Sequence, residues 1–272
     1  MIRSIPFLVQ DAYHNMAMDE YFFYCKEADS VPILRFYKWH PSSATIGRNQ
    51  SMDEEVDIEY ADSKGIQYTR RITGGGAVLH SSNGELTYMF VCPKSILDRV
   101  YNRLIDSGKF YSNSNEIPRY YVPILESLIV GLQALGLSLD INKLNCPALK
   151  VGEKKISGNA QAMRSDVVLQ HGTLLLSVNP EEMYSVLKVP EYTTKKNIVL
   201  SVKAKVGGLK DFLPVDLVEI DKLCECLKKG FCSVFGMEYT RGWAYGACMG
   251  RAIKCGRCCW AIAGSMCRST SQ

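Results

Sequence analysis

Apolar and polar positions along this chain follow two different periods. Spacings of three and four residues predict helices, whereas strict alternation or a short unbroken apolar run predicts a strand. Helices are expected over residues 10–28, 53–65, 120–137, 180–189 and 216–235. Strands are expected over residues 33–39, 44–50, 66–72, 77–79, 84–91 and 167–176, with a hairpin over 150–157. Because these elements follow no regular strand–helix repeat, the expected fold class is α/β (α+β), a mixed β-sheet with flanking helices.

Two local features refine this pattern. Asp11 stands at the start of the first predicted helix, where its carboxylate can accept a hydrogen bond from the first turn. Residues 101–116 are rich in tyrosine and asparagine, and we expect them to form a connection rather than a helix.

Composition is that of an ordinary soluble globular protein. The 272 residues are 47% hydrophobic and 22% charged, which suits one large domain or two small ones. The apolar runs are too short to span a bilayer, and residues 1–7 lack the features of a signal peptide. We therefore expect a cytoplasmic protein with no membrane partner.

The net charge of +4 depends on the last part of the chain. No acidic residue follows Glu238, whereas five basic residues do, and without these the chain has 27 basic and 28 acidic residues. The body of the protein is thus nearly neutral, so composition predicts no nucleic-acid partner.

Cysteines are also concentrated near the C-terminus. Five of the eleven lie within the last 25 residues, and the odd total favours reduced thiols over a disulfide framework. A divergent tail, a metal site or a shifted reading frame would each account for residues 239–272. We favour a frame disruption or non-native tail over zinc, because the composition changes abruptly and two C-x-x-C pairs at zinc spacing are missing. No metal site is therefore predicted.

The most informative stretch is Arg-Arg-Ile-Thr-Gly-Gly-Gly-Ala-Val-Leu-His at residues 70–80. Three consecutive glycines let the backbone approach a ligand closely, and successive N–H groups in such a turn can hold an anion. The spacing is neither that of a P-loop nor that of a dinucleotide fingerprint. We interpret it as strand, anion-holding turn, strand; a plain glycine-rich hairpin with solvated arginines is the alternative.

A second stretch, residues 152–161, carries a pair of lysines. Alternation along a strand places Lys154 and Lys155 on opposite faces, so at most one of them faces inward. An inward ammonium could neutralise a phosphate or a carboxylate in a cleft. The alternative is a solvated hairpin tip.

Together these stretches resemble the lipoate–protein ligase A family, within the biotin/lipoate ligase catalytic-domain superfamily. The resemblance runs in order through residues 15–20, 35–39, 47–50, 70–80, 84–88, 154–161 and 170–176. The biotin branch would carry a charged Gly-Arg-Gly-Arg type turn in place of the triple glycine. The resemblance implies a catalytic domain over residues 1–238, related to the cores of class II aminoacyl-tRNA synthetases, with residues 239–272 outside the family fold.

The resemblance also implies a reaction in two steps. Lipoate attacks the α-phosphate of ATP, with Mg²⁺, to give lipoyl-AMP, and a lysine of a carrier domain then takes the lipoyl group. The implied carriers are the glycine-cleavage carrier protein and the acyltransferase subunits of 2-oxoacid dehydrogenases. Lys155 matches the catalytic lysine that contacts both carboxylate and α-phosphate. The implied ATP- and adenylate-binding residues are Arg71, Gly75, Gly76, Ala77, Val78, Leu79, His80 and Lys155.

Several side chains have open interpretations. His80 and His171 lie in matched motifs, but either could be a hydrogen-bonded wall residue. An apolar run around Tyr37, Trp39 and Leu79 could line a tunnel for an eight-carbon chain, although core packing is the commoner use of such residues. Leu79 and Ser81 stand where the family usually has an aromatic residue and an aspartate, and residues 144–148 replace a usual Arg-Asn-Asp.

Two rival functions remain. Octanoyltransferase relatives use a cysteine nucleophile, for which Cys146 is the candidate, although a small buried cysteine is the plainer interpretation. A non-catalytic subunit that binds lipoate or nucleotide is the other. Many ligases of this family carry an accessory C-terminal domain, for which residues 239–272 leave no room, so we also expect a separate small accessory subunit.

Overall fold

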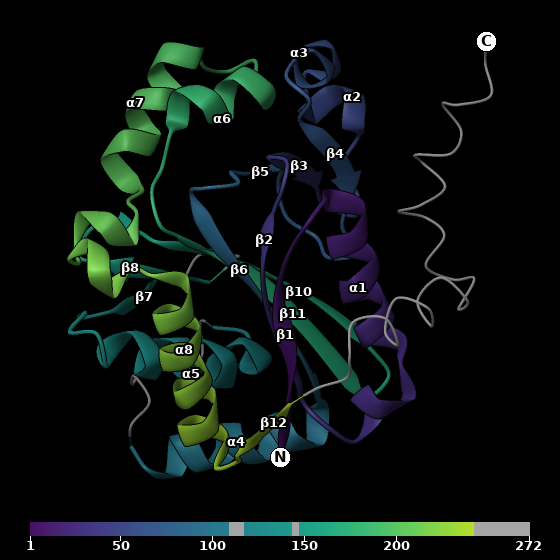
Figure 1. Cartoon of the computed structure of the whole chain (residues 1–272), viewed down its shortest axis with the longest axis vertical. Helices are drawn as coiled ribbons and strands as arrows, with labels where there is room; N and C mark the ends of the chain where they lie inside the picture. The colour runs from purple at the N-terminus through teal and green to yellow at the C-terminus, as the bar shows by residue number, and fades with distance from the viewer. Residues whose placement is uncertain (109–116, 143–146, 242–272) are drawn as a thin grey trace.

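The computed structural model describes residues 1–108, 117–142 and 147–241 and has the expected mixed α/β fold (Figure 1). In these ranges the largest sheet has six strands in the order β10–β11–β6–β2–β1–β12. They span Ser157–Arg164 (β10), Val167–Leu175 (β11), Glu85–Pro93 (β6), Ile33–Trp39 (β2), Ile2–Gln10 (β1) and Tyr239–Arg241 (β12). The pairs β10/β11, β11/β6 and β6/β2 are antiparallel, and β2/β1 and β1/β12 are parallel.

Helices cover both faces of this sheet, so its central strands are buried on each side. Along β6, Tyr88 and Phe90 pack in the cluster that contains α5 (Val122–Gln133) and α8 (Ile220–Phe235). Met89 and Val91 point the other way, into the cluster formed with α1 (Ala12–Tyr24). This alternation across a strand buried on both faces explains its near-continuous apolar sequence. α4 (Lys94–Asp106) joins α5 and α8 on the first face (Figure 1).

Two smaller sheets stand beside the large one. β3 (Ser43–Ile46) lies between β4 (Gln67–Arg70), to which it is parallel, and β5 (Val78–His80), to which it is antiparallel. The triple-glycine turn therefore links two strands that flank a third, so the plain hairpin is not observed. The other sheet is antiparallel and consists of β7 (Asp140–Asn142), β8 (Ala148–Val151) and β9 (Lys154–Lys155).

The shorter elements lie around these sheets. The helices are α2 (Met52–Glu55), α3 (Ile58–Ser63), α6 (Pro180–Val186) and α7 (Lys195–Lys205). The 3₁₀ turns are η1 (Lys26–Asp29), η3 (Arg119–Tyr121), η4 (Leu209–Asp211) and η5 (Val215–Leu217). No helix in the described ranges is long and apolar enough to cross a membrane.

Several element boundaries differ from the sequence expectations. Asp11 caps α1 as predicted, accepting a hydrogen bond from the His14 N–H at 2.8 Å, but α1 is shorter than 10–28 and ends before a 3₁₀ turn. The helix expected over 53–65 is broken, because Val56 forms a β-bridge with Leu187 between α2 and α3. β1 was not predicted.

The prediction that residues 101–116 form a connection is wrong for residues 101–106. Residues 101–106 belong to α4, whose buried face consists of Leu97, Val100 and Leu104, a helical spacing that the polar residues between them obscured. Residues 109–116 lie outside the described ranges.

Tyr239 of β12 pairs with Ile2 of β1, so a short parallel strand, Tyr239–Arg241, extends the main sheet just past the expected catalytic domain of 1–238. Residues 242–272, with the five clustered cysteines, lie outside the described ranges.

Candidate active site

A cavity of about 330 Å³ lies where the main sheet meets the two smaller ones. Its lining includes every residue that the sequence singled out for the site: Arg71, Gly75, Gly76, Ala77, Val78, Leu79, His80 and Lys155. Segments about 80 residues apart in the sequence thus face one space. The remaining walls come mainly from α1, β2, β3, β6, β10, β11, α6 and α7.

The side chains of the two lysines of β9 point in different directions, as alternation along a strand predicts. Lys155 lines the cavity. Lys154 points elsewhere, and its Nζ donates a hydrogen bond to the backbone carbonyl of Lys203 on α7. The backbone of Lys155 is held from both sides, because it pairs with Lys150 of β8 and its carbonyl accepts from the Gly207 N–H at 3.0 Å. The lysine is therefore anchored on a short but well-supported strand.

The triple-glycine turn is fixed by close backbone contact. Gly75 has φ +96°, in the region that favours glycine. A methyl group built on Gly47, at the end of β3, would lie only 2.0 Å from the Gly75 carbonyl oxygen. Glycine at position 47 is thus required for the turn to pack against β3.

Both arginines before the turn bind backbone carbonyls. Arg71 is buried; its Nη2 donates to the carbonyls of Gly74 at 2.9 Å and Gly76 at 2.7 Å, and its Nη1 donates to the Thr45 carbonyl at 3.1 Å. Arg70 donates to carbonyls of the loop after β3 and is not among the cavity-lining residues. Arg71 therefore holds the turn in this conformation, and direct contact with a nucleotide stays a prediction.

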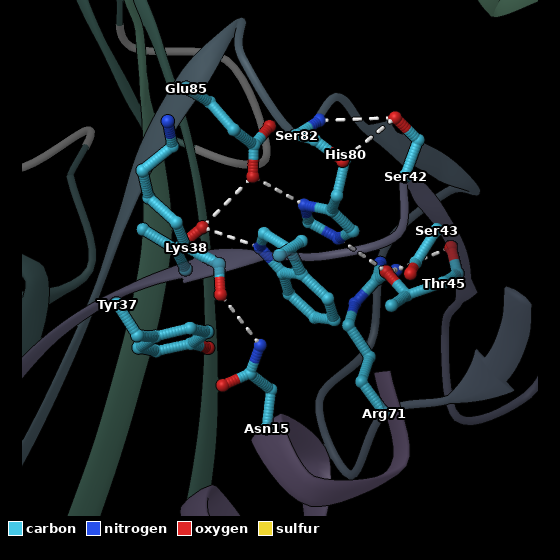
Figure 2. Close-up of polar contacts among 12 residues, drawn as sticks. Asn15, Tyr37, Lys38, Ser42, Ser43, Thr45, Arg71, His80, Ser82 and Glu85 are labelled. Carbon is cyan, nitrogen blue, oxygen red and sulfur yellow. Dashed lines mark hydrogen bonds and ion pairs between the residues drawn. The ribbon is translucent and has the colours of Figure 1, made fainter. Parts of the chain in front are cut away.

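Two histidines of the cavity wall are each held by a buried carboxylate, and Figure 2 shows the first pair, His80 and Glu85. His80 Nδ1 lies 2.7 Å from Glu85 Oε1, and its Nε2 lies 2.9 Å from Thr45 Oγ1. The Trp39 ring stacks on His80 with centroids 4.0 Å apart. Trp39 is itself held by a hydrogen bond from its indole N–H to Thr87 Oγ1 at 2.8 Å.

The second histidine, His171, is held by the buried Asp19 of α1. His171 Nδ1 lies 2.9 Å from Asp19 Oδ2, and its Nε2 lies 2.7 Å from Thr73 Oγ1. Asp19 is 1% exposed and also accepts from Arg35 at 3.0 Å and from the Tyr37 hydroxyl at 2.8 Å. Burial, followed by the Asp19 charge, raises the pKa of Tyr37 well above its usual value, so this hydroxyl stays a hydrogen-bond donor.

Much of the cavity wall is apolar. Met16, Trp39 and Leu79 form part of this wall and are almost fully buried. Such a lining with few polar groups is typical of small-molecule pockets. The apolar run expected to line a tunnel thus does line the cavity, through Tyr37, Trp39 and Leu79.

Sequence reasoning missed the residues that support this site. Thr45, Asp19 and Glu85 lie in strands or helices that approach the turn only in the folded chain. Glu85 did carry a signal, since it is the one charged residue in the predicted strand 84–91. Cys146 lies outside the described ranges, and the residue after it, Pro147, has its carbonyl 2.8 Å from Nδ2 of the cavity residue Asn159.

No group of three or more histidine, cysteine, aspartate or glutamate side chains suited to a metal occurs among the residues that the structure describes.

The sequence-family model of the lipoyl protein ligase A/B catalytic domain matches residues 11–232 of the chain. The chain belongs to this family. Its relatives in the lipoyl protein ligase A/B family include the octanoyltransferase LipM of Clostridioides difficile, 31% identical over 246 residues that cover 84% of each protein. They also include lipoate-protein ligase A subunit 1 of Thermoplasma acidophilum, 31% identical over 233 residues, 83% of this chain and 80% of that one.

Solved structures of the lipoyl protein ligase A/B family have the same fold. The bi-partite lipoate protein ligase of Thermoplasma acidophilum superposes with a TM-score of 0.73 at 29% identity, covering 93% of this chain and 91% of that one. A lipoate-protein ligase A bound with ATP also superposes with a TM-score of 0.73, at 26% identity, covering 93% of this chain and 94% of that one. The relatives thus include both ligases and octanoyltransferases, all enzymes that modify proteins with lipoyl or octanoyl groups.

Proposed function

We propose that this protein is an ATP-dependent lipoate–protein ligase. The carboxylate of lipoate attacks the α-phosphorus of ATP, the bond to the β-phosphate oxygen breaks, and pyrophosphate leaves. The ε-amine of a carrier lysine then attacks the acyl carbonyl of lipoyl-AMP. The bond to AMP breaks and one proton is released. The observation that carries the proposal is that Lys155 and the triple-glycine turn line one cavity.

The polar part of the cavity suits a reaction between two anions. No described residue accepts a hydrogen bond from the N–H groups of Gly75, Gly76 or Ala77, all of which line the cavity. Such N–H groups are donors for phosphate oxygens. The ammonium of Lys155 would offset the repulsion between carboxylate and α-phosphate as they meet, an effect that is largest in the transition state.

The apolar part of the same cavity suits the acyl chain. Its walls around Trp39 and Met16 would take an eight-carbon chain with the carboxylate toward Lys155. A volume of about 330 Å³ is at the lower end of the usual range for ligand sites, roughly 300–1,000 Å³. This supports a small extended acid as substrate.

Mg²⁺ would enter with the nucleotide. The described lining includes no carboxylate, and the nearby Glu85 is occupied by His80 and Thr87. Mg²⁺ keeps several waters and is commonly bound through substrate phosphates, so we expect phosphate oxygens to supply its ligands here.

We further propose lipoyl carrier domains as acceptors and a separate small accessory subunit. The support comes from the Thermoplasma relatives, one named as subunit 1 and one described as a bi-partite ligase with its E2 lipoyl domain. Full lipoate activation by the isolated chain would refute the need for a second subunit.

The test uses the full chain with ATP, Mg²⁺, lipoate and an unmodified carrier domain, with and without an accessory subunit. Mass spectrometry should find a carrier that has gained one lipoyl group only when ATP is present. A carrier left unmodified under every condition would refute the proposal.

A second candidate, an octanoyltransferase that uses Cys146, is favoured by the LipM relatives. It would take an octanoyl group from a carrier thioester without ATP. The contact between Pro147 and Asn159 brings the residue next to Cys146 in sequence to the cavity wall. ATP-independent transfer from the thioester, abolished by Cys146→Ala, would establish this candidate and refute the first.

A further inference from the structure

Two chains of buried polar groups hold the triple-glycine turn, one at its glycines and one at Thr73, directly before them, and the reaction steps above give these groups no part. One chain reaches the turn through β5 and β3, and the other through β11 (Figure 2 shows the first). Each consists of a carboxylate, a histidine and a threonine. Thr45, His80 and His171 themselves line the cavity, and the buried carboxylates of Glu85 and Asp19, which are not among the lining residues, hold the two histidines.

The first chain begins at Glu85 on β6. Its carboxylate binds Nδ1 of His80 at 2.7 Å, and Nε2 of that ring meets Thr45 Oγ1 at 2.9 Å. Thr45 Oγ1 also accepts from Arg71 Nη1 at 3.2 Å, and Arg71 donates to the carbonyls of two of the three glycines. The carboxylate is therefore connected to the turn through three side chains.

The second chain begins at Asp19 on α1. His171 links its carboxylate to the hydroxyl of Thr73, the residue directly before the glycines. The carbonyl of Thr73 accepts from the Arg48 N–H at 2.8 Å, which fastens the same residue to the loop after β3. The turn is thus clamped where it begins as well as along its glycines.

The carboxylates fix one direction in each chain. A carboxylate only accepts, so Nδ1 of His80 donates to Glu85 and Nδ1 of His171 donates to Asp19. Arg71 only donates, so Thr45 Oγ1 accepts from it. Each threonine hydroxyl lies opposite Nε2 of its histidine.

We propose that Thr45 and Thr73, held by His80–Glu85 and His171–Asp19, are positioning residues that set the turn for phosphate binding. By occupying Arg71 and the glycine carbonyls, the chains leave the N–H groups of Gly75–Ala77 for the ligand. This proposal rests on the proposed function, because it assigns the turn to the α-phosphate. Neither threonine touches the reacting atoms in this role.

The test replaces the Thr45 hydroxyl while keeping its shape. Thr45→Val removes the hydroxyl, Thr45→Ser retains it, and Thr69→Val is the matched control. Thr69 is the register partner of Thr45 in β4, is buried, and makes no hydrogen bond through its side chain with a described residue. Thr73→Val tests the second chain in the same way.

Steady-state kinetics with the full chain and its accessory subunit give the readout. Leaving one buried hydrogen-bond partner unsatisfied changes an equilibrium constant roughly 5- to 100-fold. Thr45→Val and Thr73→Val should lower kcat/KM for ATP by this factor, with KM for lipoate within about twofold of wild type. Thr45→Ser should recover most of the loss, and Thr69→Val should match wild type. All assays are run at a temperature well below the lowest midpoint of thermal unfolding among the variants.

The outcomes separate the two proposals. A wild-type protein without ATP-dependent activity refutes the proposed function and this role with it. An active wild type whose Thr45→Val variant matches Thr69→Val refutes the positioning role alone. Equal increases in KM for ATP and lipoate would also refute it, because they indicate general disruption of the cavity.

Discussion

The contact between Gly47 and the triple-glycine turn predicts that Gly47→Ala inactivates the enzyme without unfolding it. The added methyl would lie 2.0 Å from the Gly75 carbonyl oxygen, and Cβ atoms essentially never come within 3.0 Å of such an atom. The turn must therefore move by at least about 1 Å. A displacement of that size at a reacting group costs roughly 100-fold in rate.

The effect on stability should be smaller than the effect on activity. Overpacking costs about 1–3 kcal/mol, which most domains of this size tolerate. We expect kcat/KM for ATP to fall roughly 100-fold while the protein still unfolds cooperatively in urea. Gly74→Ala is the control, since its methyl meets nothing within 4 Å in the same turn. A Gly47→Ala variant with wild-type kinetics, or an equal loss in Gly74→Ala, would refute this account of the turn.

Three further predictions concern single side chains. Lys155→Met should lower kcat for adenylate formation about 10²- to 10³-fold, the usual cost of removing one donor to the transition state. Lys154→Met should stay within a few-fold of wild type, because this lysine binds the backbone of Lys203. Pyrophosphate release is the assay, and equal losses in the two variants would contradict the prediction. Cys146→Ala should keep the ATP-dependent activity. A variant that no longer modifies the carrier would instead favour the octanoyltransferase that uses a Cys146 thioester. Burial raises the pKa of Cys224 from 9.0 to about 12, so between these values the unfolded chain loses a proton that the folded chain keeps. Stability to urea should therefore fall as pH rises through this window, and Cys224→Ala should fall less steeply; identical slopes would refute the shift.

The parts of the site that sequence could predict are those with a local signature. Three adjacent glycines predicted the turn, and alternation predicted that at most one of the two lysines faces inward, whereas the choice of Lys155 came from the family resemblance. Thr45 has no such signature. Its role depends on β3 lying between β4 and β5, a pairing that no local pattern specifies.

The same distinction applies to the fold. β6 and β11 were predictable because strands buried on both faces have nearly continuous apolar sequences. β1 has a mixed burial pattern, and its place in the sheet depends on β2 and on β12, more than 200 residues away. α4 was missed because only three of its thirteen residues are buried among many polar ones.

The central claim is that Lys155 and the triple-glycine turn bring the carboxylate of lipoate to the α-phosphate of ATP. Lipoate labelled with heavy oxygen in its carboxylate tests it most directly, by mass spectrometry of the AMP released after transfer to the carrier. We predict that AMP gains one labelled oxygen in its phosphate. Modified carrier accompanied by unlabelled AMP, or by no AMP, would contradict the claim.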